Sequence, residues 1–137
     1  MRFHAMAAVS ALGFLIFVDP AAADKCADAQ DQATMNQCAD NAYKASDAKL
    51  NKVYKQITGR LKDDHDTARL LVTAQKAWIA FRDAECGFAS SGVAGGSIQP
   101  MVRAQCLDSV TQDRIKSLNS YLNCEEGDMS CPVPPAD

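Results

Sequence analysis

Six cysteines are the residues of this chain best suited to chemistry, since a thiol can bind a metal, attack a substrate or form a disulfide. No two of them have the C-x-x-C spacing typical of zinc sites and haem attachment. His65 is the only histidine after the first 23 residues and flanks no cysteine, so a thiol nucleophile would lack a base. We therefore predict no metal site, no cofactor and disulfide bonding of Cys26, Cys38, Cys86, Cys106, Cys124 and Cys131.

The charged residues form no recognisable catalytic motif. Adjacent carboxylates at 63–64 and 125–126 fall in a polar turn and near the C-terminus, where nothing would bury them and shift a pKa. The sequence contains no Ser-His-Asp set, phosphate-binding loop or dinucleotide fingerprint. Ion pairing between helices, for example of Arg82 or Arg114 with Asp47, explains the charges of the central segment. We therefore predict that the protein is not an enzyme and has no catalytic residues.

The first 23 residues have the pattern of a secretory signal peptide. A basic start precedes an apolar run over residues 5–18, then Pro20 and three alanines ending at Ala23. The run is too short to span a membrane, and no lipobox precedes Cys26. We expect cleavage near Ala23, no stable membrane anchor, and a location in the periplasm or outside the cell, where disulfides persist.

The length and the net charge of the chain further limit the class of protein to which it can belong. The chain has 137 residues, enough for one domain, and a formal net charge of −3, which argues against a nucleic-acid partner. We divide it into a signal peptide (1–23), a helical domain (24–124) and an acidic, proline-rich tail (125–137) that we expect to be extended and mobile.

Apolar spacing predicts an all-α fold: a small antiparallel bundle of three main helices at about 35–62, 66–86 and 98–123, stapled by disulfides. Thr34 and Gln37 resemble a capping box, so we expect the first helix to start after Thr34. Asp66 and Ser97 are the expected caps of the second and third helices, with Pro100 in the third helix's first turn.

The order of the helices limits the cysteine pairing. Cys86 and Cys106 flank the turn between the second and third helices, Cys26 precedes Cys38 closely, and the last two enclose a short tail loop. We therefore predict the pairs Cys26–Cys38, Cys86–Cys106 and Cys124–Cys131. Because Cys38 lies at the same bundle end as Cys86, the pairs Cys38–Cys86 and Cys26–Cys106 remain the alternative.

Several blocks resemble the LprI-like lysozyme-inhibitor family over about Cys26 to Cys124. They are MNQCA (35–39), ASDAKLN (45–51), AQKAWIAFRDAEC (74–86), Pro100-Met101, Cys106-Leu107 and Thr111-x-x-Arg114. The resemblance implies a helical, disulfide-bonded envelope protein that binds a protein partner, and some members of the family inhibit lysozyme.

The matching residues of the central block also suit a scaffold. We expect Trp78 and Phe81 to fill the core, because apolar residues at helical spacing usually do. We expect Arg82, Asp83 and Arg114 to tie the helices together.

Lysozyme acts with two carboxylates in a cleft, so an inhibitor has to place donors or a plug there. A flexible segment, residues 87–96 with four glycines, precedes the third helix, whose N-terminus would present unpaired N–H groups. The candidate inhibitory contacts are Ser90, Ser91, Gly95, Gly96 and Ser97. In the alternative, these residues only form the turn and cap the helix.

A second functional class also fits the sequence. The chain could be an interaction module, such as an immunity or adaptor protein for another envelope enzyme, without lysozyme inhibition. Acidic groups near residues 63–66 and 125–128 could steer it to a basic partner.

Overall fold

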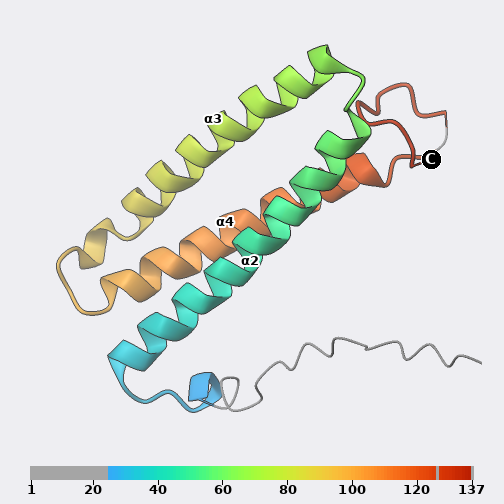
Figure 1. Ribbon diagram of the computed structural model, residues 1–137. Helices are drawn as coiled ribbons and strands as arrows, with labels where there is room; N and C mark the ends of the chain where they lie inside the picture. The colour runs from blue at the N-terminus through green and yellow to red at the C-terminus, as the bar shows by residue number, and fades with distance from the viewer. Residues whose placement is uncertain (1–24, 126, 137) are drawn as a thin grey trace, which may run out of the picture.

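The computed structural model describes residues 25–125 and 127–136, so the predicted signal peptide lies outside the described residues. Three long helices, α2 (Gln32–Arg60), α3 (His65–Ala89) and α4 (Gln99–Leu122), run antiparallel to their neighbours in sequence (Figure 1). A short 3-10 helix, η1 (Ser91–Val93), lies between α3 and α4. No strand occurs in the described part of the chain, and the predicted all-α bundle is confirmed.

Two of the predicted N-cap residues are wrong, because a nearby aspartate caps each helix instead. Asp31, not Thr34, caps α2: its carboxylate accepts from the Thr34 amide at 2.8 Å and from the Thr34 hydroxyl at 2.6 Å. Asp64, not Asp66, caps α3, accepting from the Thr67 amide at 3.0 Å. In both cases the carboxylate reaches the amide three residues later, where helix N–H groups lack partners.

The C-terminal end of α3 and the N-terminal end of α4 also differ from expectation. α3 continues through Gly87 to Ala89, because one glycine weakens a helix without ending it. α4 begins after Ile98, and no side chain caps it, so the predicted Ser97 cap is wrong. Pro100 does lie in the first turn of α4, where a missing N–H costs nothing.

The core lies mainly between α2 and α4. From α2 it contains Leu50, Val53, Ile57 and Leu61, and from α4 Ile115 and Leu118, all buried. Trp78 and Leu71 of α3 pack against this cluster while remaining partly exposed. The pair α2–α4 therefore forms the stable unit, and α3 lies along it.

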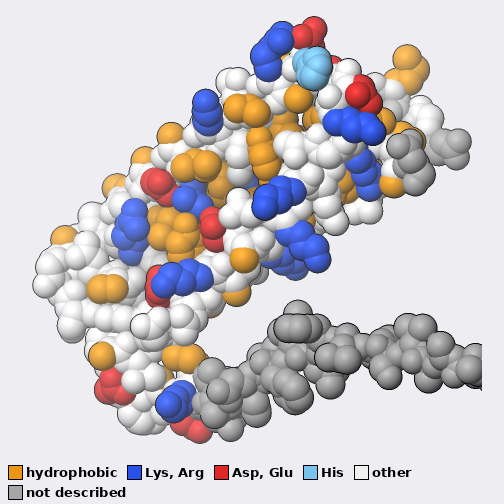
Figure 2. Space-filling model, viewed as in Figure 1, with side chains coloured by type: hydrophobic (Ala, Val, Ile, Leu, Met, Phe, Trp, Pro, Cys, Tyr) orange, Lys and Arg blue, Asp and Glu red, His pale blue; other side chains and the backbone are white. Residues whose placement is uncertain are grey.

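α3 is the least buried of the long helices. Arg82 and Cys86 are its only buried residues. Phe81 is 56% exposed, so the expectation that it fills the core is wrong. Hydrophobic side chains are visible on the surface along α3 in Figure 2. Apolar spacing predicted burial of Phe81, but the described elements leave most of its side chain uncovered.

Three disulfides hold the ends of the bundle: Cys26–Cys38, Cys86–Cys106 and Cys124–Cys131. These are the pairs predicted from helix order, and the alternative pairing is not found. Cys86–Cys106 joins the end of α3 to α4, so it holds the otherwise loosely packed α3 against the core.

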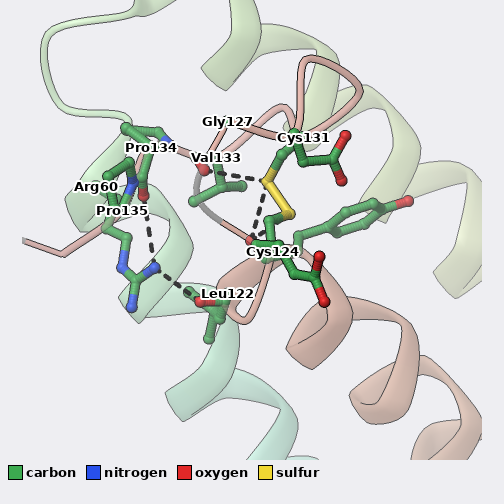
Figure 3. Close-up of a pocket in the computed structure, with 11 residues that line it drawn as sticks. Arg60, Leu122, Cys124, Gly127, Cys131, Val133, Pro134 and Pro135 are labelled. Carbon is green, nitrogen blue, oxygen red and sulfur yellow. Dashed lines mark hydrogen bonds between the residues drawn. A yellow bond between two sulfur atoms is a disulfide. The ribbon is translucent and has the colours of Figure 1, made fainter.

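The described part of the tail is folded, contrary to the expectation of a mobile segment. Val133 is only 5% exposed and belongs to the core cluster. One guanidinium nitrogen of Arg60 donates to the carbonyl of Leu122 at 3.0 Å and to that of Pro134 at 3.5 Å (Figure 3). The second half of the tail therefore closes the end of the bundle.

Candidate functional site

The segment from Ser90 to Ile98 forms the turn between α3 and α4 at one end of the bundle (Figure 1). Its backbone is hydrogen-bonded to itself: Val93 to Ser90, Ala94 to Ser91, and Gly96 to Val93, at 3.0–3.2 Å. Consecutive turns of this kind fix most of the φ and ψ angles. The flexible segment expected from the glycines is therefore an ordered turn, which we call the end loop.

At two positions of the end loop the structure favours glycine over other residues. Gly95 has φ +78°, a left-handed conformation that other residues rarely adopt. A Cβ on Gly96 would lie 3.2 Å from the carbonyl oxygen of Val93, which is tighter than most contacts. By contrast, Gly92 has open space around it and no positive φ.

Ser90 belongs to the interior and not to the surface of the end loop. It is 1% exposed, and its hydroxyl donates to the Cys86 carbonyl at 2.8 Å. Its proposed role as a direct inhibitory contact is therefore wrong. The hydroxyl satisfies a helix-end carbonyl next to the Cys86–Cys106 disulfide and anchors the base of the loop.

The N-terminus of α4 offers fewer open donors than expected. The Gln99 amide donates to the Gly96 carbonyl at 3.1 Å, and Pro100 has no N–H. The side-chain oxygen of Gln99 accepts from the Gly95 amide at 2.9 Å. The Asn36 side chain donates to the Ser97 carbonyl at 2.9 Å, which ties the loop to α2.

Four of the five predicted contact residues remain on the surface: Ser91, Gly95, Gly96 and Ser97, all exposed. The loop carries no formal charge, since no Lys, Arg, Asp or Glu occurs between Glu85 and Arg103. Its accessible groups are two serine hydroxyls and glycine backbone, which can hydrogen-bond a partner closely. None of these groups is activated for a reaction.

A second cluster connects α3 to α2. Arg82 is 8% exposed, and its guanidinium carbon lies 5.5 Å from the Tyr43 ring centre and 5.1 Å from that of Trp78. Its nitrogens contact Asp83 at 2.9 Å and Asp47 at 3.4 Å. Arg82 joins α3 to α2 through the Tyr43 ring and Asp47, as expected. Asp83, by contrast, pairs with Arg82 inside α3 and, among the described residues, forms no ion pair with another helix.

Arg114 completes this layer from α4. Its guanidinium lies 5.9 Å from the centre of the Trp78 ring, and its Nε donates to Gln75 at 3.0 Å. Partial burial lowers the pKa of Arg114 below its usual value. The predicted role in tying helices together holds for Arg114, although its hydrogen-bond partner is Gln75 and not Asp47.

No reactive centre is seen in the part of the chain that the structure describes. Within residues 25–125 and 127–136, no group of three or more His, Cys, Asp or Glu side chains lies close enough to hold a metal ion. All six cysteines are in disulfides. His65 occupies the exposed first position of α3, at the opposite end of that helix from the end loop.

The folded tail encloses a pocket that the sequence did not predict. It has a volume of about 430 Å³ and is lined by Arg60, Tyr121, the Cys124–Cys131 disulfide and Pro134, among others (Figure 3). Arg60 is the only basic residue of this lining, and its hydrogen bonds go to backbone carbonyls. The lining also includes the carboxylates of Glu125 and Asp128, and the pocket exists because the tail folds back onto the bundle.

Comparisons with known proteins decide the family. The family model described as lysozyme inhibitor LprI matches residues 22–118. The chain belongs to the LprI family. This match spans all three long helices except the last residues of α4, and it includes the end loop and the Arg82 cluster.

Two curated relatives of this LprI family member match over most of their length. An uncharacterized protein of Rhizobium meliloti (strain 1021) is 37% identical over 112 residues, covering 74% of this chain and 81% of the relative. The uncharacterized protein YecT of Escherichia coli (strain K12) is 30% identical over 112 residues, covering 72% and 69%. No solved structure matches. Among the described helices, none has both the length and the hydrophobicity needed to cross a membrane.

Proposed function

We propose that this protein is exported and inhibits a lysozyme by non-covalent binding, with the exposed part of the end loop entering the active-site cleft. The observation that carries the proposal is the membership of the LprI family, which is an inhibitor family. Three disulfides support export, because such bonds persist in oxidising compartments.

The end loop has the properties that a cleft blocker needs. Its turn hydrogen bonds and the nearby Cys86–Cys106 disulfide order it before binding, which reduces the entropy lost on association. Glycines allow close approach of the backbone, and the hydroxyls of Ser91 and Ser97 can donate to a catalytic carboxylate. An uncharged loop also avoids repulsion by these carboxylates.

The first experiment measures cell-wall lysis by several lysozymes in the presence of the purified, oxidised chain from Asp24. We expect at least one lysozyme to be inhibited with saturable, one-to-one stoichiometry. If no lysozyme is inhibited while a different envelope protein is captured stoichiometrically, the interaction-module alternative replaces this proposal.

The second experiment tests the loop. Gly92 lies in open space with ordinary φ, so Gly92→Tyr adds bulk without straining the fold, and Ser91→Ala with Ser97→Ala removes both hydroxyls. We expect each change to weaken inhibition at least tenfold. Lys52→Ala, on the exposed face of α2, is the matched control and should leave inhibition unchanged. Full inhibition by both loop variants would show that another surface binds lysozyme.

A further inference from the structure

An exposed apolar stripe runs along one side of α3, and its first two residues, Leu70 and Ala74, also line a pocket with Tyr121 of α4. The stripe consists of Leu70, Ala74, Ala77, Phe81, Ala84 and Phe88, all exposed, and we call these six residues the α3 stripe. Leu70 is 71% exposed, Phe81 56% and Phe88 77%. Their spacing alternates four and three residues, the pattern of a coiled-coil seam. At 1.5 Å per residue the stripe is about 27 Å long.

One border of the stripe is also free of charge. Thr73, Ala80 and Gly87 lie beside the stripe, seven residues apart, and all three are exposed and small. Small residues along a helix let a second helix approach closely. A monomer rarely exposes a continuous apolar patch of more than about 300–600 Å² unless the patch is an interface.

We propose that the α3 stripe binds a second copy of this chain, with the two α3 helices antiparallel about a twofold axis. In this arrangement Phe81 of each copy lies opposite Ala77 of the other, so a large side chain meets a small one. The same register pairs Leu70 with Phe88 and Ala74 with Ala84, whereas a parallel arrangement would place Phe81 against Phe81 and Phe88 against Phe88.

Charges at the edge of the stripe favour the same orientation. Lys76 and Asp83 lie on the same side of the helix as Thr73, Ala80 and Gly87, one position further from the stripe, and both are exposed. The twofold axis passes beside residue 79, so Lys76 lies three residues before it and Asp83 four residues after it. Antiparallel helices therefore bring Lys76 of each copy near Asp83 of the other, which gives two such pairs. In a parallel pair the twofold axis runs along the helices and places the two copies of Lys76 on opposite sides of the interface, so no such Lys76–Asp83 pairs form.

The exposed area suits a dimer of moderate strength. A phenylalanine carries roughly 200 Å² of surface, so Phe81 and Phe88 expose roughly 270 Å² between them. With Leu70 and the small residues, and counted on both copies, the buried total reaches about 1,000 Å², the lower bound for a specific interface. We therefore expect a dimer that dissociates on dilution through the micromolar range.

Sedimentation equilibrium of the oxidised chain, from about 1 to about 500 μM, tests the proposal. Phe81→Glu should weaken self-association at least tenfold. The matched control is Ile79→Glu: Ile79 is also a partly exposed hydrophobic residue (40%) of α3, but it lies on the opposite side of the helix from the stripe. It should change self-association less than twofold, with helix content of both variants checked by circular dichroism.

Orientation is tested with charge reversal. Lys76→Glu should weaken the dimer a few-fold, because in the antiparallel pair it brings a carboxylate near Asp83 of the other copy; Asp83 is left unchanged, since it also pairs with Arg82 at 2.9 Å. A dimer left unchanged by Lys76→Glu would overturn the antiparallel arrangement. A wild-type monomer at every concentration, or equal effects of Phe81→Glu and Ile79→Glu, would overturn the dimer. If the wild type is monomeric and Phe81→Glu abolishes its binding to lysozyme, the α3 stripe is a lysozyme-binding surface and the dimer proposal is overturned.

Discussion

At the scale of single residues, Arg82 is the side chain on which the position of α3 depends most. It is the one buried charge of that helix, it stacks between Tyr43 and Trp78, and it contacts Asp47 of α2. Its desolvation is offset because two carboxylates and two ring faces surround the guanidinium. Removing the Arg82 side chain would leave a cavity between the rings and would leave the carboxylates of Asp47 and Asp83 without their partner.

Replacing Arg82 with alanine should therefore lower the free energy of unfolding by about 2–3 kcal/mol. The carboxylates of Asp47 and Asp83 are 40% and 50% exposed and can regain water, which keeps the loss below that of a fully buried pair. Thermal unfolding should show a Tm lower by roughly 8–12 °C.

Arg69→Ala is the control for this change. Arg69 pairs with Asp66, but the two side chains are 75% and 85% exposed, so the pair contributes about 0.5 kcal/mol or less. Equal effects of the two substitutions would contradict the role assigned to Arg82.

At the scale of elements, helix starts depend on carboxylates. Asp31 and Asp64 accept hydrogen bonds from Thr34 and Thr67, and these bonds lower both pKa values below the usual 3.8. A group with a lowered folded-state pKa stabilises the fold above its unfolded pKa and loses that effect as the pH falls through the folded value. Acid should therefore weaken α2 and α3 at their first turns.

The double variant Asp31→Asn, Asp64→Asn should reduce this acid sensitivity. Asparagine also caps helices but does not titrate. Between about pH 5 and about pH 2, we expect the Tm of the wild type to fall further than that of the variant. Parallel Tm curves over this range would mean that other carboxylates control acid stability.

The end loop gives a second prediction at this scale. Gly95→Ala places a side chain at φ +78° and should cost about 1 kcal/mol of stability, with weaker lysozyme inhibition. Gly92→Ala, in open space, should leave stability unchanged or slightly raised. Urea unfolding of both variants measures the difference, and equal midpoints would show that the left-handed turn is not needed.

At the scale of the whole molecule, the disulfides differ in how well they are protected. Cys86 is fully buried, and its bond joins α3 to α4, whereas Cys26–Cys38 and Cys124–Cys131 lie at exposed ends. A reductant reaches a sulfur only when the surrounding structure admits it. The ends of the chain should therefore open before the bundle does.

Limited reduction followed by alkylation and mass spectrometry should reveal this order. We expect Cys26–Cys38 and Cys124–Cys131 to be alkylated first, with helix content retained, and Cys86–Cys106 last, together with loss of structure. In the chain-entropy model the 20-residue separation of Cys86 and Cys106 corresponds to about 3 kcal/mol. Early opening of Cys86–Cys106 would mean that α3 detaches readily.

The amino-acid sequence by itself determined the helices and limited the cysteine pairing to two arrangements, between which only the structure decided. Helical periodicity is local, and the order of three helices leaves few cysteines close enough to join. The sequence did not determine the caps, because Asp31, Thr34, Asp64 and Asp66 can all accept from a helix amide and only the path of the chain selects one.

Tertiary structure alone decided which faces are covered. Periodicity showed that Phe81 and Phe88 lie on an apolar side of α3, but not that α2 and α4 pack mainly with each other and leave that side open. Likewise, Ser90 is interior because α3 runs past Gly87, and Val133 is buried because the tail folds back. Burial depends on neighbours distant in sequence, and a pattern read along one segment contains no information about them.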